Sequence, residues 1–86
     1  MYAVHYAPEA QEDAQKLTPA MAKRARQLID ILKKNPFQNP PPYEKLHGNL
    51  NGFYSRRLNI KHRLVYAVLK KEKIVRILSM WSHYGE

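Results

Sequence analysis

Two protic side chains, His83 and Tyr84, follow a strand-like run that begins at Lys73. An unperturbed imidazole changes charge near neutral pH, so a histidine where a short sheet ends is suited to proton transfer. Upstream lie a lone acid in a proline-rich stretch, Glu44, and a basic segment that ends at Arg63. An acid, a base and a cation are together what the cleavage of RNA requires, because the 2′-hydroxyl of RNA is itself the nucleophile.

Three arginines could hold the phosphate of such a substrate, since a planar guanidinium can bind two oxygens at once. Side chains alternate across a strand, so Arg57 shares one face with Ser55, whereas Arg56 lies on the other face. These two neighbouring arginines therefore cannot line the same cleft. The alternative interpretation of Arg56, Arg57 and Arg63 is that they are surface charges that keep the chain soluble.

A metal site is disfavoured by the distribution of acids and histidines. The only acids after residue 43 are Glu44, Glu72 and Glu86, and metal-dependent phosphoryl transfer usually needs several clustered carboxylates. The four histidines show no ligand spacing such as HxxxH. We therefore expect neither a metal nor another cofactor, and a candidate base, Glu44, that stands alone on a stiff connector.

Aromatic residues near these positions could stack the bases of single-stranded RNA, although Tyr54 and Trp81 could equally be packing residues. The candidates for stacking are Tyr43, Tyr54, Trp81 and Tyr84. Alternation along the last strand predicts one face with Val75, Ile77, Ser79 and Trp81, and another with Arg76, Leu78 and Met80.

Composition favours one small domain, residues 1–86, with a modest core. The chain has no cysteine, which excludes a disulfide framework and fits a reducing, cytoplasmic location. No apolar run approaches the ~20 residues that span a bilayer. The net charge is +8, and residues 44–86 hold nine Lys/Arg against three Asp/Glu. Such a field attracts polyanions, although it could also serve only solubility.

The expected fold class is α+β, in the order β-α-α-β-β-β. The two helices should pack on one face of an antiparallel sheet, because short turns join the last three strands and leave the other face for a partner. Thr18 should cap the second helix, with Pro19 at its first position. The predicted elements are a strand over Tyr2–Tyr6, helices from Pro8 or Glu9 and from Pro19 to Asn35, and strands over Phe53–Asn59, from Arg63 or Leu64 to Leu69, and from Lys73 to about Trp81.

One motif runs from Glu44 to Tyr66 and reads Glu-x5-Leu-x-Gly-x2-Ser-Arg-Arg-x4-His-Arg-Leu-Val-Tyr, and a terminal His-Tyr follows it. With this motif the chain resembles the Txe/YoeB toxins of type II toxin-antitoxin modules, which belong to the RelE superfamily. The resemblance is dense from Asn35 to Val68 and at the C-terminus. The first predicted helix departs from it, because it lacks the aromatic residues that many members carry there.

The resemblance implies a ribosome-dependent mRNA endoribonuclease of microbial-RNase fold, without a metal. It implies partners as well: the ribosome and mRNA, a YefM/Phd-like antitoxin that inhibits the enzyme, and a second copy of the chain in a homodimer. Glu44 matches the general base, Arg63 the phosphate-stabilising cation, His83 the general acid, and Tyr84 a residue that orients the substrate. The RNA- or phosphate-binding positions that it implies are Lys45, His47, Arg56 and Arg57.

Two other functions are compatible with the sequence. A non-nucleolytic toxin of the related ParE type, which poisons DNA gyrase, would share the α/β scaffold but would not need the set Glu44, Arg63 and His83. A simple nucleic-acid-binding module would need only charge and aromatic residues, and would bind with a steep salt dependence without cutting a strand.

Overall fold

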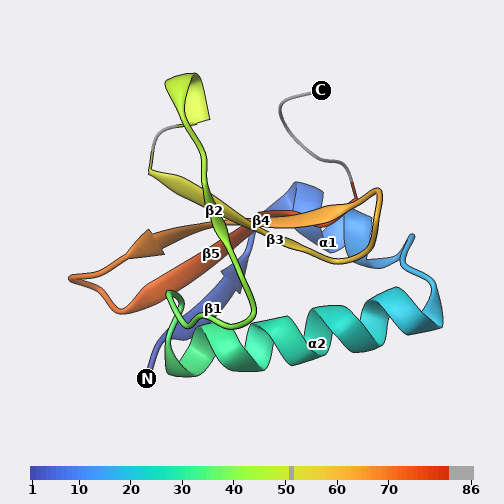
Figure 1. Ribbon diagram of the computed structural model, residues 1–86, viewed down its shortest axis with the longest axis horizontal. Helices are drawn as coiled ribbons and strands as arrows, with labels where there is room; N and C mark the ends of the chain where they lie inside the picture. The colour runs from blue at the N-terminus through green and yellow to red at the C-terminus, as the bar shows by residue number, and fades with distance from the viewer. Residues whose placement is uncertain (51, 82–86) are drawn as a thin grey trace.

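The computed structural model describes residues 1–50 and 52–81 of the chain (Figure 1). Its sheet has the strand order β1-β5-β4-β3-β2. No helix in this part of the chain is long and apolar enough to cross a membrane. The elements are β1 (Ala3–Tyr6), α1 (Pro8–Ala14), α2 (Pro19–Lys34), β2 (Glu44–Lys45), a single 3-10 turn (Gly48–Leu50), β3 (Phe53–Arg57), β4 (Arg63–Leu69) and β5 (Ile74–Ser79).

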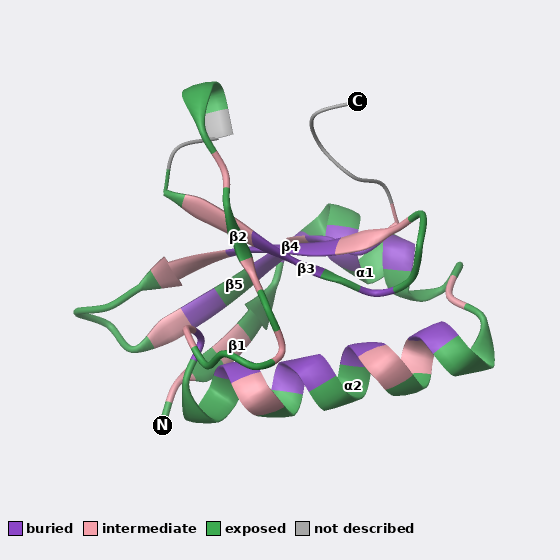
Figure 2. Ribbon diagram, in the orientation of Figure 1, coloured by how far each residue is buried: buried purple, intermediate pink, exposed green. Residues whose placement is uncertain are grey.

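Helix α2 begins where the sequence predicts. The hydroxyl of Thr18 accepts a hydrogen bond from the Met21 amide at 3.2 Å, and Pro19 occupies the first turn, where its missing N–H is not needed. The helix turns one apolar stripe toward the sheet, as the buried segments along α2 show (Figure 2). The stripe consists of Met21, Ala25, Leu28, Ile29 and Leu32.

Both helices pack on the same face of the sheet. Ala10 of α1 belongs to one buried cluster with the α2 stripe and with side chains of the central strands, such as Leu64, Tyr66 and Val75. The prediction of two helices on one face is therefore confirmed. The opposite face carries no helix in the part of the chain that the structure describes.

The sheet is mixed, which corrects the expectation of a purely antiparallel one. Strands β2, β3, β4 and β5 pair antiparallel in sequence order, as predicted for a meander, but β1 pairs parallel to β5, with Ala3 opposite Ile74. A parallel neighbour needs a long crossover connection, and the chain between β1 and β5 supplies it. The short strand β2 was not predicted, because it has only two residues and a single tyrosine separates it from three consecutive prolines.

A β-bulge changes which residues of β5 face the helices. The register between β4 and β5 shifts at Val65 and Tyr66, so that Tyr66 lies opposite Ile77 while Val65 lies opposite Ser79. The extra residue moves Ser79 to the face away from the helices, and Met80 joins the helix-side core. The prediction from simple alternation, which placed Ser79 on the same sheet face as Ile77, is therefore wrong.

A buried carboxylate on α1 holds the chain that leaves β5. Asp13 is only 5% exposed, and its Oδ2 accepts hydrogen bonds from the amides of Met80 at 3.0 Å and of Trp81 at 3.3 Å. Both amides lie beyond the end of β5 at Ser79, so Asp13 supplies an acceptor where the strand pairing has ended. Asp13 thus fixes the backbone at Met80 and Trp81, directly after the end of β5.

Replacement of Asp13 by alanine should destabilise the fold, because two buried amides would lose a charged acceptor. We expect a loss of about 2 to 4 kcal/mol in the free energy of unfolding, measured by denaturant titration. The exposed neighbour Glu12 offers the control, and Glu12→Ala should change stability by no more than about 0.5 kcal/mol. Equal effects of the two substitutions would contradict the role given to Asp13.

Candidate functional site

Four polar residues gather on the sheet face that lies away from the helices. Glu44 of β2 pairs with Ser55 of β3, and Arg57 pairs with Arg63 of β4. Directly paired residues point to the same face, as do residues two apart on one strand. We call these four residues, Glu44, Ser55, Arg57 and Arg63, the open-face cluster.

Arg63 lies at the centre of the open-face cluster. Its Nη2 is 2.7 Å from Oε1 of Glu44, and its Nε donates a hydrogen bond of 2.9 Å to Oγ of Ser55. The Arg63 side chain is 18% exposed and that of Glu44 is 68% exposed. The guanidinium is therefore fixed by two partners, while the carboxylate remains open to solvent and to a substrate.

Ser55 was not predicted as a site residue. Strand alternation had placed it on the same face as Arg57, but the register that brings Arg63 within hydrogen-bonding distance depends on the β3–β4 pairing. The serine is 2% exposed, so its hydroxyl is available to Arg63 rather than to solvent. Its contribution is to orient the guanidinium.

Arg56 occupies a different place from the one implied by the motif. Its side chain is fully buried on the helix side of the sheet, opposite Leu64 in the register. The guanidinium donates to backbone carbonyls of the loop before β2, at 3.0 Å to Pro36, 2.9 Å to Gln38 and 2.7 Å to Pro41. The expectation that Arg56 binds a phosphate is thus corrected, since this arginine binds the protein's own backbone.

Aromatic rings complete the anchoring of this loop. Tyr66 donates a hydrogen bond to the carbonyl of Pro36 at 2.9 Å and accepts one from Nε of Arg56 at 3.2 Å. Tyr43, just before Glu44, packs its ring against Tyr54 with centroids 5.9 Å apart, and the Arg56 guanidinium carbon lies 5.1 Å from the centre of the Tyr43 ring. Tyr43 and Tyr54 are therefore packing residues of the loop anchor in this structure, not free platforms for bases.

The remaining predicted residues are not gathered into the open-face cluster. Lys45 is exposed but pairs with Tyr54, which puts it on the face opposite Glu44. His47 is exposed beyond the end of β2. His83 and Tyr84 lie outside the described residues. The last described residue before them, Trp81, stacks its ring on that of His62 at a centroid distance of 4.2 Å.

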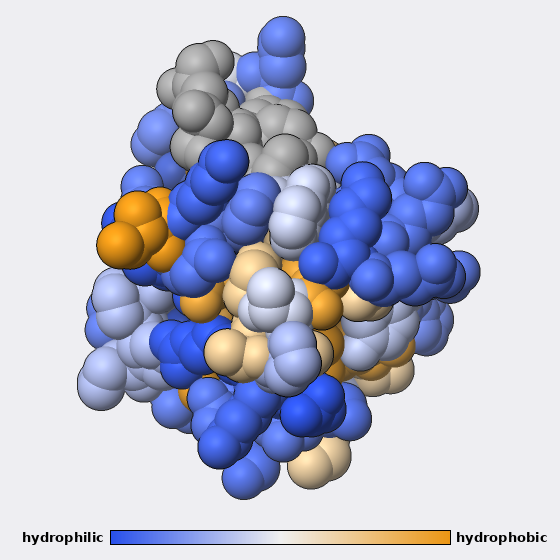
Figure 3. All heavy atoms as spheres, turned by 90° about the vertical axis from the view of Figure 1, so that its right-hand side faces the viewer, coloured by the Kyte–Doolittle hydropathy of each residue, from blue (hydrophilic) through white to orange (hydrophobic). Residues whose placement is uncertain are grey.

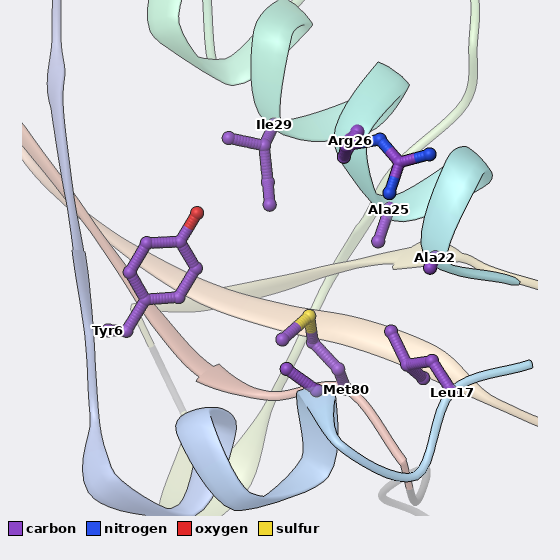
Figure 4. Close-up of a pocket in the computed structure, with 8 residues that line it drawn as sticks. Tyr6, Leu17, Ala22, Ala25, Arg26, Ile29 and Met80 are labelled. Carbon is purple, nitrogen blue, oxygen red and sulfur yellow. The ribbon is translucent and has the colours of Figure 1, made fainter. Parts of the chain in front are cut away.

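A separate apolar pocket of about 320 Å³ lies on the helix side. Tyr6, Leu17, Ile29 and Met80 direct their side chains into the same space (Figure 4). Apolar atoms also gather at the centre of one side of the molecule, within a hydrophilic surround (Figure 3). Burial, reinforced by the negative charge of Asp30, raises the pKa of the Tyr6 hydroxyl. The pocket shares no residue with the open-face cluster.

Comparison with known proteins identifies the family. Residues 6–84 match the model of the YoeB-like toxin of bacterial type II toxin-antitoxin systems. The chain belongs to this family. Toxin YoeB of Mycobacterium bovis is 37% identical over 98% of this chain and 100% of its own, and toxin YoeB of Synechocystis is 38% identical over 74% and 72%, respectively.

Solved structures of family members share the fold. A YoeB-YefM complex from Staphylococcus aureus superposes with a TM-score of 0.81 at 34% identity, covering 98% of this chain and 99% of that one. A YoeB/ParE toxin from Agrobacterium tumefaciens gives a TM-score of 0.86 at 26% identity, covering 95% and 99%. This YoeB-like toxin therefore has the α+β fold expected of RelE-type proteins.

Replacement of Arg56 by methionine should release the loop that precedes Glu44. The carbonyls of Gln38 and Pro41 and the hydroxyl of Tyr66 would lose a donor, whereas the carbonyl of Pro36 would keep its hydrogen bond from Tyr66. Acceptors left without a partner cost about 1 to 3 kcal/mol each. We expect at least about 3 kcal/mol lower stability, together with faster amide hydrogen exchange in residues 37–45. Arg57→Met, at the exposed neighbouring position, is the control and should change stability by about 0.5 kcal/mol or less. Matching losses in the two variants would refute the anchoring role of Arg56.

The hydroxyl of Tyr66 should make stability fall at alkaline pH. Burial raises its pKa to about 12 from the ordinary value of 10.0, although the charge and hydrogen bond of Arg56 oppose the rise. Because the folded state holds the proton more tightly, the stabilisation is complete below pH 10 and disappears as pH rises toward 12. The stability difference between wild type and Tyr66→Phe should therefore shrink over this range. A difference that stays constant in denaturant titrations from pH 9 to 12 would be the contrary result.

Proposed function

We propose that this YoeB-like toxin is an endoribonuclease that cleaves mRNA on the ribosome. The observation that carries the proposal is the Glu44–Arg63 pair, joined at 2.7 Å on the open face of the sheet. A carboxylate acceptor beside a fixed guanidinium can take up a proton while positive charge stands next to the reacting phosphate. Both residues are those that the family motif implies for general base and cation.

The proposed reaction uses the 2′-hydroxyl of the RNA as the nucleophile. Glu44 accepts the 2′-hydroxyl proton as the bond between O2′ and phosphorus forms, and Arg63 stabilises the charge on the non-bridging oxygens. The bond between phosphorus and O5′ then breaks, and His83 donates a proton to the departing oxygen. The products are a 2′,3′-cyclic phosphate and a 5′-hydroxyl end. Tyr84 orients the substrate, and Ser55 keeps the Arg63 fork in place.

Partners follow from the relatives and from charge. We infer that an antitoxin of the YefM/Phd type inhibits this toxin, because the similar S. aureus protein is found in a YoeB-YefM complex. A homodimer is supported by the S. aureus YoeB dimer, which has a TM-score of 0.82 at 34% identity and covers 96% of this chain and 98% of that one. The net charge of +8 favours association with the phosphates of the ribosome.

Replacement of Glu44 by glutamine should reduce mRNA cleavage strongly while it leaves the fold intact. Removal of a general base typically costs about 10²- to 10⁴-fold in rate, and the exposed Glu44 side chain contributes little to packing. Primer extension on mRNA from translating cells, or from purified ribosomes, measures the cut ends. Glu72→Gln removes the same charge from an exposed turn and serves as the control, with cleavage like that of wild type.

A toxin that acts on DNA gyrase would give a different result, because its activity would not depend on Glu44. The A. tumefaciens neighbour bears the double name YoeB/ParE, so a toxin acting on DNA gyrase is the competing function. Gyrase supercoiling with purified protein separates the two functions. Inhibition of supercoiling by wild type and Glu44→Gln alike, without cut mRNA, would sink the nuclease proposal.

A further inference from the structure

A second concavity, of about 390 Å³, lies between α2, the proline loop and the end of β3. Arg24 of α2 and Arg57 of β3 both line it, although they are far apart in sequence. Pro41 and Pro42 form part of its wall, and the tip of the β3–β4 connection contributes Ile60. Two arginines from different elements thus line one hollow.

The positive charge of this hollow is not neutralised internally. The ion pairs within residues 1–50 and 52–81 are Asp13–Lys16 and Glu44–Arg63, so neither Arg24 nor Arg57 is paired with a carboxylate there. Among the described residues, no acidic side chain lines the hollow. An anion is therefore the ligand that its electrostatics favour, and arginine is the residue best shaped for phosphate oxygens.

The hollow shares Arg57 with the open-face cluster. Arg57 lies directly opposite Arg63 in the β3–β4 register, so the hollow adjoins the Glu44–Arg63 pair through this residue. Because successive phosphates of an RNA strand repeat at short intervals, a strand placed at Arg63 would pass Arg57 with its next groups. Arg57 is thus the residue that both places share.

The apolar part of the hollow suits a base rather than a bare phosphate. Ile60 is 94% exposed, and the two prolines form a rigid surface that cannot donate hydrogen bonds. The side-chain oxygen of Asn59 is occupied by the amides of Lys61 and His62, which leaves its NH₂ group to donate to a ligand. Single-stranded nucleic acid combines charge on the backbone with flat apolar base faces.

We propose that Arg24, Arg57 and the Pro41–Pro42 wall form a second subsite, which holds one phosphate and the adjoining base of single-stranded RNA beside the scissile nucleotide. This inference rests on the proposed function, since it places the RNA strand relative to Glu44 and Arg63. It adds Arg24, a residue of the second helix, to the contacts made by the sheet.

The test is binding of a short fluorescein-labelled oligonucleotide with 2′-O-methyl groups, which cannot be cleaved, followed by anisotropy at several salt concentrations. Arg24→Gln should weaken binding about tenfold and lower the slope of log K against log salt by about 0.7, the value for one phosphate contact on a single strand. Ile60→Ser should weaken binding without changing the slope. Arg26→Gln removes the same charge from the same helix but lines the other pocket, and it should leave both quantities near wild type.

Three outcomes decide between the explanations. Equal losses in Arg24→Gln and Arg26→Gln would overturn the subsite in favour of a diffuse positive field. Competition by poly-glutamate as effective as that by poly-uridylate would also overturn it, because the hollow would then select charge and not nucleotides. If the slope of log K against log salt depends on Arg24, the subsite is upheld. If mRNA cleavage also survives in Glu44→Gln, the proposed chemistry is refuted while the subsite stands.

Discussion

The buried guanidinium of Arg56 is the constraint on which the rest of the site depends. A charge without solvent must be satisfied by fixed polar groups, since an unpaired one would cost several kcal/mol. Here the groups are carbonyls of Pro36, Gln38 and Pro41, with the hydroxyl of Tyr66. Proline lacks the amide needed for a strand ladder, so this loop cannot be held by ordinary sheet pairing. Arg56 supplies the missing donors and thereby gives the loop one path toward β2.

Strand geometry explains how neighbouring residues can have opposite tasks. In the run Ser55, Arg56, Arg57 the outer two residues face the open side and the middle one faces the helices. Ser55 orients Arg63 by a hydrogen bond of 2.9 Å, while Arg56 fixes the segment that delivers Glu44. Two strands therefore bring Glu44 and Arg63 together. The proline loop positions Glu44 on β2, and the β3–β4 hairpin positions Arg63 on β4. A shift of the β3 register by one residue would exchange the sheet faces on which Arg56 and Arg57 lie, and would disrupt both roles.

Local signals in the sequence were enough for the helices and hairpins, but not for contacts between distant segments. The Thr18 cap and the apolar stripe of α2 were predictable because their determinants lie within a few turns. The carbonyl partners of Arg56 lie 15 to 20 residues away, so nothing near this arginine in the sequence distinguishes a loop anchor from a phosphate ligand. The parallel pairing of β1 with β5 and the bulge at Val65 depend likewise on tertiary packing. Glu44 and Arg63 were candidates from their residue types, and the family motif assigned their roles, but alternation alone would have left the distance between them undetermined.

In the open-face cluster, the residue that would attract RNA differs from the residues that would carry out the proposed chemistry. Because Glu44 and Arg63 form an ion pair at 2.7 Å, their charges largely cancel beyond a few ångströms, and the pair exerts little long-range pull on a polyanion. In the proposed function, attraction of RNA must therefore come from cations without a carboxylate partner, and Arg57 has no such partner among residues 1–50 and 52–81. In the reaction that we propose, an arriving phosphate would share Arg63 with Glu44, while the Ser55 hydrogen bond limits rotation of the guanidinium. Binding of the RNA strand would thereby weaken the Glu44–Arg63 ion pair and free the carboxylate to accept the 2′-hydroxyl proton.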